Sequence, residues 1–404
     1  MQGKKIALLT LQHFANAPRA QKEAGSLARA GANVTVFGSW WSDERAEEDT
    51  RLALQLGVQF IPLIDFRSPS FSIRLKGKIA RELFKRFGLV LPETYGPSAR
   101  AMLREIKSLR PDLTMVHCEP GLWAGKKLIE AGFKVGIDFE DWFSEDLLPE
   151  SRKERPVAAL AELEKFMLRN SAVSFTTTQS MADALADWAD LKEVPVVTPN
   201  CFPWADAPKG NDNADKRDPD CVSFYWFSQT IGPGRGLETL SQALSQITGD
   251  WQVHLRGNLG NHQSWFERVF PESIRDRVIV HDPVSNHDLP RHSASHDIGL
   301  ALEIPYCKNK DFTASNKIFE YLRCGLATIA TKTSGQAEVL AECPGAGWLV
   351  PPEDPDALAQ RLQSCVGTPQ SVARAKDEAL SAASSIWDWE RYERILVKAV
   401  EAAL

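Results

Sequence analysis

The sequence predicts an α/β protein built from two doubly wound, Rossmann-like domains of similar size. Short apolar runs alternate with helical patterns through residues 1–204, an order that is typical of parallel sheets covered by helices. A polar segment interrupts this alternation at 205–220, and a second alternating series follows at 221–385. With 404 residues, the chain is long enough for each half to bury its own core.

The first half is expected to form one doubly wound α/β domain. Apolar runs bounded by turn residues predict strands, and these lie at 6–11, 33–38, 58–64, 113–117, 134–138, 172–177 and 194–198. The segments between them have helical periodicity, which predicts helices at 18–30, 98–109, 121–131, 157–169 and 180–188. The polar segment 205–220, ADAPKGNDNADKRDPD, is interpreted as an interdomain linker.

The second half repeats the alternation. Strands are expected at 222–227, 251–256, 278–280, 298–302, 327–331 and 347–350, and helices at 237–246, 265–269, 288–295, 316–323, 337–341 and 355–365. Residues 386–404 hold one more amphipathic helix. Ligands of doubly wound sheets bind outside the carboxyl ends of the strands. Two such domains are therefore expected to face a cleft that accepts two substrates.

Composition excludes several classes of protein. The net charge of −6 argues against a general nucleic-acid binder. Seven cysteines are scattered without a C-x-x-C pair, so neither a disulfide framework nor a zinc site is expected. No apolar run reaches the length of a membrane-spanning helix, and the first residues do not form a signal peptide. These observations predict a cytoplasmic protein.

The segment 315–330 is the most informative part of the chain. Ser315, Asn316 and Lys317 open an expected helix, and Glu320 lies three residues after Lys317 on the same face. A helix N-terminus with an added lysine suits a diphosphate, and the Glu320 carboxylate suits the hydroxyl groups of a ribose. The alternative is an amphipathic helix on which Lys317 and Glu320 form a surface ion pair.

Two further loops belong to the same expected edge of the second sheet. The loop 228–238 contains Gly234 and Arg235, which allow close backbone approach and supply a fixed fork for phosphate. The alternative is a flexible surface turn. After the strand at 327–331 come Ser334 and Gly335, which would lie over a bound nucleotide or form a plain loop with a helix N-cap.

In their order, these segments resemble the nucleotide-sugar site of glycosyltransferase family 4, which has the GT-B fold. The resemblance runs over about residues 4–404 and is more specific in the second half. It implies that Arg235 and Lys317 bind the donor diphosphate, that Glu320 binds the ribose, and that helix 386–404 crosses back to the first domain. By family frequency, the expected donor is a UDP-sugar.

The sequence departs from the family at two positions. Many members have an acid eight residues before the ribose-binding glutamate, where this chain has Phe312. Asp311 and Glu303 are candidates to replace that acid. In the first half, Glu140 stands where the family usually has a histidine.

Residues near strand ends in the first half are candidates for the acceptor side. Arg19 and Glu23 open the first helix and match the family pattern, although residues four apart can also simply form a helix ion pair. His117 follows another strand and is either a cleft residue or a structural hydrogen-bonding group. Asp138, Glu140 and Asp141 lie at a third strand end. Such acids favour a functional site, and an exposed acidic loop is the alternative.

The resemblance implies a mechanism with two open outcomes. In a retaining enzyme, Arg235 and Lys317 would stabilise the leaving diphosphate, and no metal or other cofactor would be needed. An inverting enzyme would need a base, for which Asp138, Glu140 and Asp141 are the candidates. A nucleotide-sugar epimerase on the same fold, or a non-catalytic binding protein, remains an alternative to a transferase.

A basic stretch at 66–92 suggests one further partner. It contains seven arginines and lysines but only one acidic residue, Glu82. Aromatic and aliphatic residues alternate with the basic ones. This pattern is typical of segments that lie on anionic membranes, although a solvated helix with extended basic side chains is an alternative. A membrane partner would make the acceptor a lipid-linked sugar at the inner face of the cell membrane, in polysaccharide or glycolipid assembly.

Overall fold

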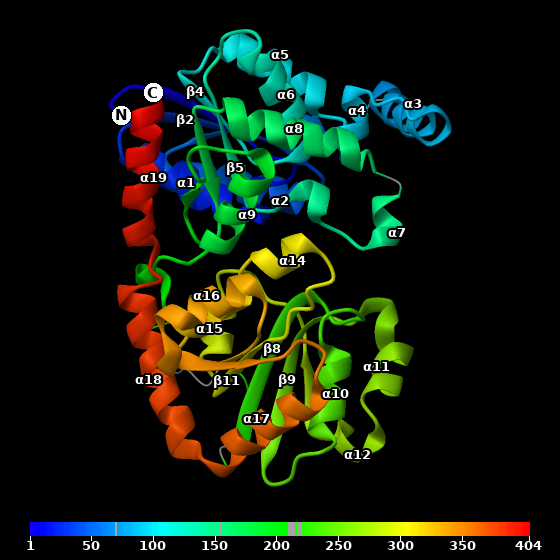
Figure 1. Ribbon diagram of the computed structural model, residues 1–404, viewed down its shortest axis with the longest axis vertical. Coiled ribbons are helices and arrows are strands. Elements are labelled where there is room, and N and C mark those ends of the chain that lie inside the picture. The colour runs from blue at the N-terminus through cyan, green and yellow to red at the C-terminus, as the bar shows by residue number, and fades with distance from the viewer. Residues whose placement is uncertain (69–70, 154, 209–214, 216–217, 219) are drawn as a thin grey trace. The chain divides into compact units, whose positions relative to one another are not determined.

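The computed structural model describes residues 1–68, 71–153, 155–208, 215, 218 and 220–404. These residues form two compact units (Figure 1). The first consists of residues 1–198 and 392–404, and the second of residues 199–391. Most of the expected linker, 205–220, lies outside the described residues, so its role as a linker stays a prediction.

The first unit is built on a seven-stranded parallel sheet with the order β3-β2-β1-β4-β5-β6-β7. The strands are β1 Lys5–Leu9, β2 Asn33–Trp40, β3 Gln59–Asp65, β4 Leu113–Val116, β5 Val135–Phe139, β6 Val173–Thr176 and β7 Val196–Val197. All pairs are parallel. The expected strand at 194–198 is thus reduced to two paired residues.

Helices separate these strands along the chain. They are α1 Pro18–Arg29, α2 Asp43–Leu56, α3 Phe71–Phe87, α4 Pro92–Tyr95, α5 Ala99–Leu109, α6 Glu119–Ile129, α7 Pro149–Arg152, α8 Val157–Asn170 and α9 Gln179–Ala189. Leu396 and Val400, from α19 Trp389–Ala403, pack into the core formed by β1, β2 and α1. The C-terminal segment is therefore part of this unit.

The second unit has a six-stranded parallel sheet with the order β10-β9-β8-β11-β12-β13. Its strands are β8 Val222–Thr230, β9 Trp251–Asn258, β10 Val278–His281, β11 Ile298–Ala301, β12 Ala327–Thr331 and β13 Gly347–Val350. Its helices are α10 Leu237–Leu244, α11 Gln263–Val269, α12 Glu272–Arg275, α13 Leu289–Ser293, α14 Lys308–Phe312, α15 Asn316–Arg323, α16 Ser334–Glu342, α17 Pro355–Gly367 and α18 Pro369–Ser385. Both sheets match the expected α/β class, with strands β8, β11 and β12 ending at the same edge.

Short 3₁₀ helices complete the path of the chain, at Phe14–Asn16, Phe143–Glu145, Trp204–Asp206, Gly260–His262 and Pro344–Ala346. No helix in the described ranges has both the length and the apolar character that a membrane crossing needs.

Some elements were missed in the sequence. Helix α2 was not expected, although Ser42 caps its first turn and Gly57 ends it in the left-handed region at φ 68°. The loop expected before Ser315 contains the short helix α14. Helix α18 was also missed, because its buried side chains are mostly alanines, including Ala375, Ala379 and Ala382, and alanine gives a weak apolar periodicity.

Candidate functional site

The glycine-rich loop after β8 is anchored to the end of β11. A Cβ atom on Gly236 would lie 2.4 Å from the carbonyl oxygen of Leu302, and Gly236 has φ 77°. Only glycine allows this approach. The neighbouring Arg235 is exposed, and its Nη1 donates to Ser228 Oγ at 2.9 Å. The loop therefore holds a cation at the edge where β8 and β11 end.

Lys317 lies at the same edge, beside Glu303. Its Nζ is 2.7 Å from Glu303 Oε1, and Ser315 Oγ donates to the same oxygen at 2.9 Å. Burial alone would raise the pKa of Glu303, but the charge and hydrogen bond of Lys317 lower it to about 2. Because Glu303 follows Leu302, which contacts Gly236, the structure brings Lys317 and the Arg235 loop to one edge.

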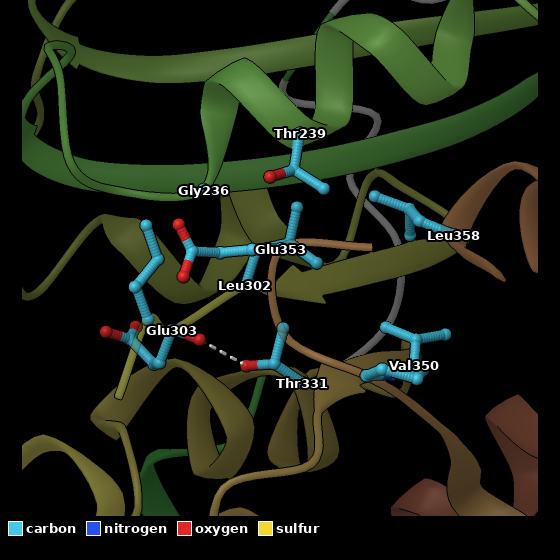
Figure 2. Close-up of a pocket in the computed structure, with 10 residues that line it drawn as sticks. Gly236, Thr239, Leu302, Glu303, Thr331, Val350, Glu353 and Leu358 are labelled. Carbon is cyan, nitrogen blue, oxygen red and sulfur yellow. Dashed lines mark hydrogen bonds between the residues drawn. The ribbon is translucent and has the colours of Figure 1, made fainter. Parts of the chain in front are cut away.

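A small pocket of about 10 Å³, with room for about one water molecule, lies between these elements (Figure 2). In Figure 2 the side chains of Glu303 and Glu353 lie on one side of it, opposite Val350 and Leu358. Thr331 Oγ1 donates to the carbonyl oxygen of Glu303 at 2.6 Å. Two carboxylates beside an apolar wall suit hydroxyl groups, because a carboxylate accepts hydrogen bonds only.

Glu320 lies on the same helix as Lys317 but does not meet it. Its carboxylate is 1% exposed and accepts from Arg323 Nε at 2.8 Å. The guanidinium of Arg323 lies 3.9 Å from the ring centroid of Phe202. The alternative of a surface Lys317–Glu320 pair is wrong, because each residue has another partner. The role of Glu320 in ribose binding stays a prediction, and a ribose would have to reach it past Arg323.

Ser334 and Gly335 form the start of α16 and pack against α14. Asp311 accepts from Ser334 N at 3.0 Å and from Ser334 Oγ at 2.8 Å. A Cβ on Gly335 would lie 2.4 Å from the carbonyl oxygen of Phe312. Thr333 is the N-cap of α16, since its side chain accepts from Gln336 N. Asp311, one position before Phe312, thus joins the two segments instead of facing a free site.

In the first unit, Arg19 is bound to Asp138. Arg19 Nε donates to Asp138 Oδ2 at 2.6 Å, and Nη1 donates to the carbonyl oxygen of Thr198 at 2.6 Å. Arg19 and Asp138 are 2% and 1% exposed. Since Asp138 is buried and paired with Arg19, it does not belong to an exposed acidic loop.

Glu23 is paired with His117, not with Arg19 as a helix pair would require. His117 Nε2 lies 2.8 Å from Glu23 Oε2, and His117 Nδ1 lies 3.9 Å from Asp138 Oδ2. Burial by itself lowers the pKa of His117, but the charges of Glu23 and Asp138 outweigh it and leave the pKa raised. Ligand-type atoms of these three residues lie within 4.8 Å of one another. All three residues were acceptor-side candidates in the sequence, which did not predict that they meet, because they come from three separate elements.

Glu140 and Asp141 follow β5 and are half-buried. Burial raises the pKa of Glu140, and the charge of Arg19 opposes that shift. A carboxyl group with a raised pKa at a strand end is a candidate for proton transfer.

A buried polar cluster in the second unit was also missed in the sequence. The carboxylate of Asp215 accepts from Arg256 Nη2 at 2.6 Å and lies 2.6 Å from His292 Nδ1 and 3.1 Å from His296 Nε2. Tyr225 stacks on His296 with ring centroids 4.4 Å apart. Burial alone would raise the pKa of Asp215, but the hydrogen bonds of His296 and Arg256 lower it strongly.

The comparisons with known proteins agree with this geometry. Residues 224–367, which include the Arg235 loop, Lys317 and the pocket, match the family model of the glycosyl transferases group 1. No curated protein sequence matches the chain. The chain is a glycosyltransferase, and the match lies in its second unit.

Solved structures show that the fold is GT-B. Sucrose-phosphate synthase from Thermosynechococcus elongatus is similar with a TM-score of 0.72 and 16% identity, covering 98% of each chain. HepE from Anabaena in complex with UDP-glucose has a TM-score of 0.71 and 17% identity, covering 99% of this chain and 100% of its own. A glycosyltransferase from Rickettsia africae has a TM-score of 0.66 and 14% identity, covering 99% and 100%.

Proposed function

We propose that this protein transfers a sugar from a UDP-sugar to a hydroxyl acceptor, in the manner of glycosyltransferase family 4. The observation that carries the proposal is the placement of two cations, Arg235 and Lys317, at the edge where β8 and β11 end. A helix N-terminus adds partial positive charge there, with Ser315 as N-cap and Asn316 as the first helical residue. Gly234 leaves room for the diphosphate, and the carboxylate of Glu303 would accept hydrogen bonds from sugar hydroxyls.

The mechanism that fits these residues stabilises the leaving group. Negative charge develops on the diphosphate as its bond to the sugar breaks, and fixed cations favour that charge in the transition state. Lys317 is held in place by Glu303 before the donor arrives, so little reorganisation is needed. With two cations in this role, the proposed reaction needs no metal, and we propose that it is retaining, as in the family that the sequence resembles. In an inverting reaction, Glu140 or Asp141 would be the base, because Asp138 is held by Arg19.

The first unit would receive the acceptor. Arg19 and His117 lie at its strand ends and are the proposed acceptor-side residues. We propose that the acceptor is a glycan or a lipid-linked sugar in polysaccharide or glycolipid assembly. The protein would then act in the cytoplasm, at the inner face of the cell membrane.

Calorimetric titration with UDP, GDP, ADP and CMP tests the donor site. We expect UDP to bind with micromolar affinity. Glu320→Gln should weaken UDP binding by about tenfold or more, because a hydrogen bond to a charged group contributes about 1.5–3 kcal/mol. The exposed Glu342→Gln at the end of α16, in the same unit, is a matched loss of one negative charge and should leave binding unchanged.

If no nucleotide binds, the proposed donor site is contradicted and a non-catalytic protein is favoured. Equal binding of UDP to the wild type and to Glu320→Gln would also contradict the proposed site. Turnover of UDP-glucose without an acceptor product would favour an epimerase or hydrolase. A new glycoside that forms only with acceptor present would support the transferase.

Removal of metal is the second test of the proposal. We expect sugar transfer to be unchanged after dialysis against a chelator, because Arg235 and Lys317 supply the positive charge at the diphosphate. Activity that falls on chelation and returns with one divalent cation would contradict this. Glu23→Gln would then show whether the Glu23, His117 and Asp138 cluster holds that cation, since it should raise the metal concentration needed.

A further inference from the structure

Helix α3 carries apolar side chains that its own unit does not cover. Among its described residues only Ala80 is buried. Phe71, Leu75 and Ile79 are 79%, 42% and 46% exposed. Their spacing of four residues places them in one stripe along the helix. A continuous exposed apolar stripe indicates an interaction surface.

A basic stripe runs beside the apolar one. Arg74, Lys78, Arg81 and Lys85 are all exposed and are four, three and four residues apart, so they also share one side of the helix. The only acid within α3 is Glu82, which lies 3.6 Å from Arg86. In a chain with net charge −6, this positive charge is a local feature.

Helix α3 packs against the short helix α4 (Figure 1). On α4 there is also a groove. Its walls come from α4, α6 and α8 and include Tyr95, Trp123 and Lys126. Leu91, at its rim, follows the exposed Phe87 and Leu89 at the end of α3. Tryptophan and tyrosine favour the boundary between hydrocarbon and water. The groove therefore adds residues suited to that boundary beside the apolar and basic stripes of α3.

We infer that α3 and this groove form a binding surface for an anionic phospholipid bilayer. The apolar stripe inserts between the head groups, the basic stripe contacts their phosphates, and Tyr95 and Trp123 lie at the level of the head groups. The inference rests on the proposed function only in its purpose, which is to bring the protein to a lipid-linked acceptor. The surface itself is defined by α3 and the groove.

Charge and shape favour a bilayer over other occupants. A nucleic acid would use the basic stripe but would leave Phe71, Leu75 and Ile79 in water. A second copy of the chain, packed symmetrically through α3, would place the two basic stripes against each other. An interfacial helix uses both stripes at once, because the apolar side is buried in the acyl boundary and the cations face anionic lipid.

Co-sedimentation of the full chain with vesicles tests the inference. We expect binding to vesicles of phosphatidylcholine with phosphatidylglycerol and little binding to phosphatidylcholine alone. The double variant Leu75→Glu, Ile79→Glu should bind the anionic vesicles at least about tenfold more weakly. Loss of Arg74 or Lys78 by substitution with alanine should weaken binding about fivefold each. Leu54→Glu, at an 83% exposed leucine of α2, is the matched control and should bind normally.

Equal binding to neutral and anionic vesicles would overturn the inference, and so would anionic binding that the double variant Leu75→Glu, Ile79→Glu leaves unchanged. A third contrary result is a protein that does not bind vesicles but forms a dimer in solution, which this double variant abolishes. Calorimetry with UDP on the same proteins separates this inference from the proposed function. UDP binding without vesicle binding refutes only the surface, and vesicle binding without UDP binding refutes only the donor site.

Discussion

Replacing Lys317 with methionine is expected to lower kcat for sugar transfer by about 100- to 1000-fold. This is the usual cost of removing one preorganised group that stabilises developing negative charge. The side chain of Lys317 is 14% exposed, and its Nζ lies 2.7 Å from Glu303 Oε1. Because this ion pair fixes its conformation, the charge is already in position when the reaction begins. Steady-state kinetics with the UDP-sugar and acceptor would measure the loss, and Arg235→Met should give a loss of the same order.

Three controls accompany this prediction. Arg374→Met removes an exposed cation of α18 in the same unit and should leave kcat unchanged. Lys317→Arg keeps the charge and should retain more activity than Lys317→Met. Because Lys317→Met leaves Glu303 with fewer partners, thermal unfolding would confirm that the variant is folded. A folded Lys317→Met protein with normal kcat would exclude Lys317 from the reaction.

Replacing Asp215 with asparagine is expected to destabilise the second unit by about 3–5 kcal/mol. Removing one partner of a buried ion pair leaves the other charge uncompensated. Here that charge is Arg256, whose side chain is 5% exposed, while Asp215 is 4% exposed. Hydrogen exchange of amides in β8, β9 and β10 would report the stability of this unit separately from the other.

The exposed Asp220→Asn is the matched control and should change stability by less than about 0.5 kcal/mol. Adding Arg256→Met to Asp215→Asn should recover part of the loss, because the uncompensated charge is then gone. Unchanged exchange in Asp215→Asn would show that the cluster does not support the fold.

The pH dependence of this cluster has a definite sign. The pKa of Asp215 is lower in the folded state than the unfolded value of about 3.9. Its stabilisation is therefore present above about pH 4 and is lost only as the pH falls through the folded value, in strong acid. Burial, the largest cause, lowers the pKa of His281, so its neutral form is favoured in the folded state. The Asp215 comparison is best made above about pH 7, where His281 is neutral in both states.

The sequence correctly predicted that the segments proposed to bind the donor follow strand ends. The Arg235 loop follows β8, Lys317 opens α15 and Ser334 opens α16, as the alternation of apolar runs and helical patterns indicated. These placements depend on local signals, namely glycine positions, caps and periodicity. What the sequence did not predict was the side-chain partner at each place. Lys317 pairs with Glu303, and Asp311 pairs with Ser334.

On the acceptor side too, the sequence predicted the positions of residues in the fold but not their side-chain partners. Arg19, His117 and Asp138 were all recognised as residues near strand ends. The alternative that helix spacing offered, an ion pair of Arg19 with Glu23, is wrong. Arg19 instead reaches Asp138, which is 119 residues away. Helix spacing measures only neighbours on one helix, whereas the sheet order places β1, β4 and β5 side by side.

By itself, the sequence determined that this is an α/β chain of two Rossmann-like units, because hydrophobic periodicity and turn residues act over a few neighbouring positions. Only the tertiary structure decided which charges are compensated. Asp215 meets His296, 81 residues later, and Arg19 meets Asp138, 119 residues later. A buried charge without a partner is destabilising, so buried charged residues form ion pairs where packing brings opposite charges together. Because the partners are far apart in the sequence, no local pattern predicts which residues will pair.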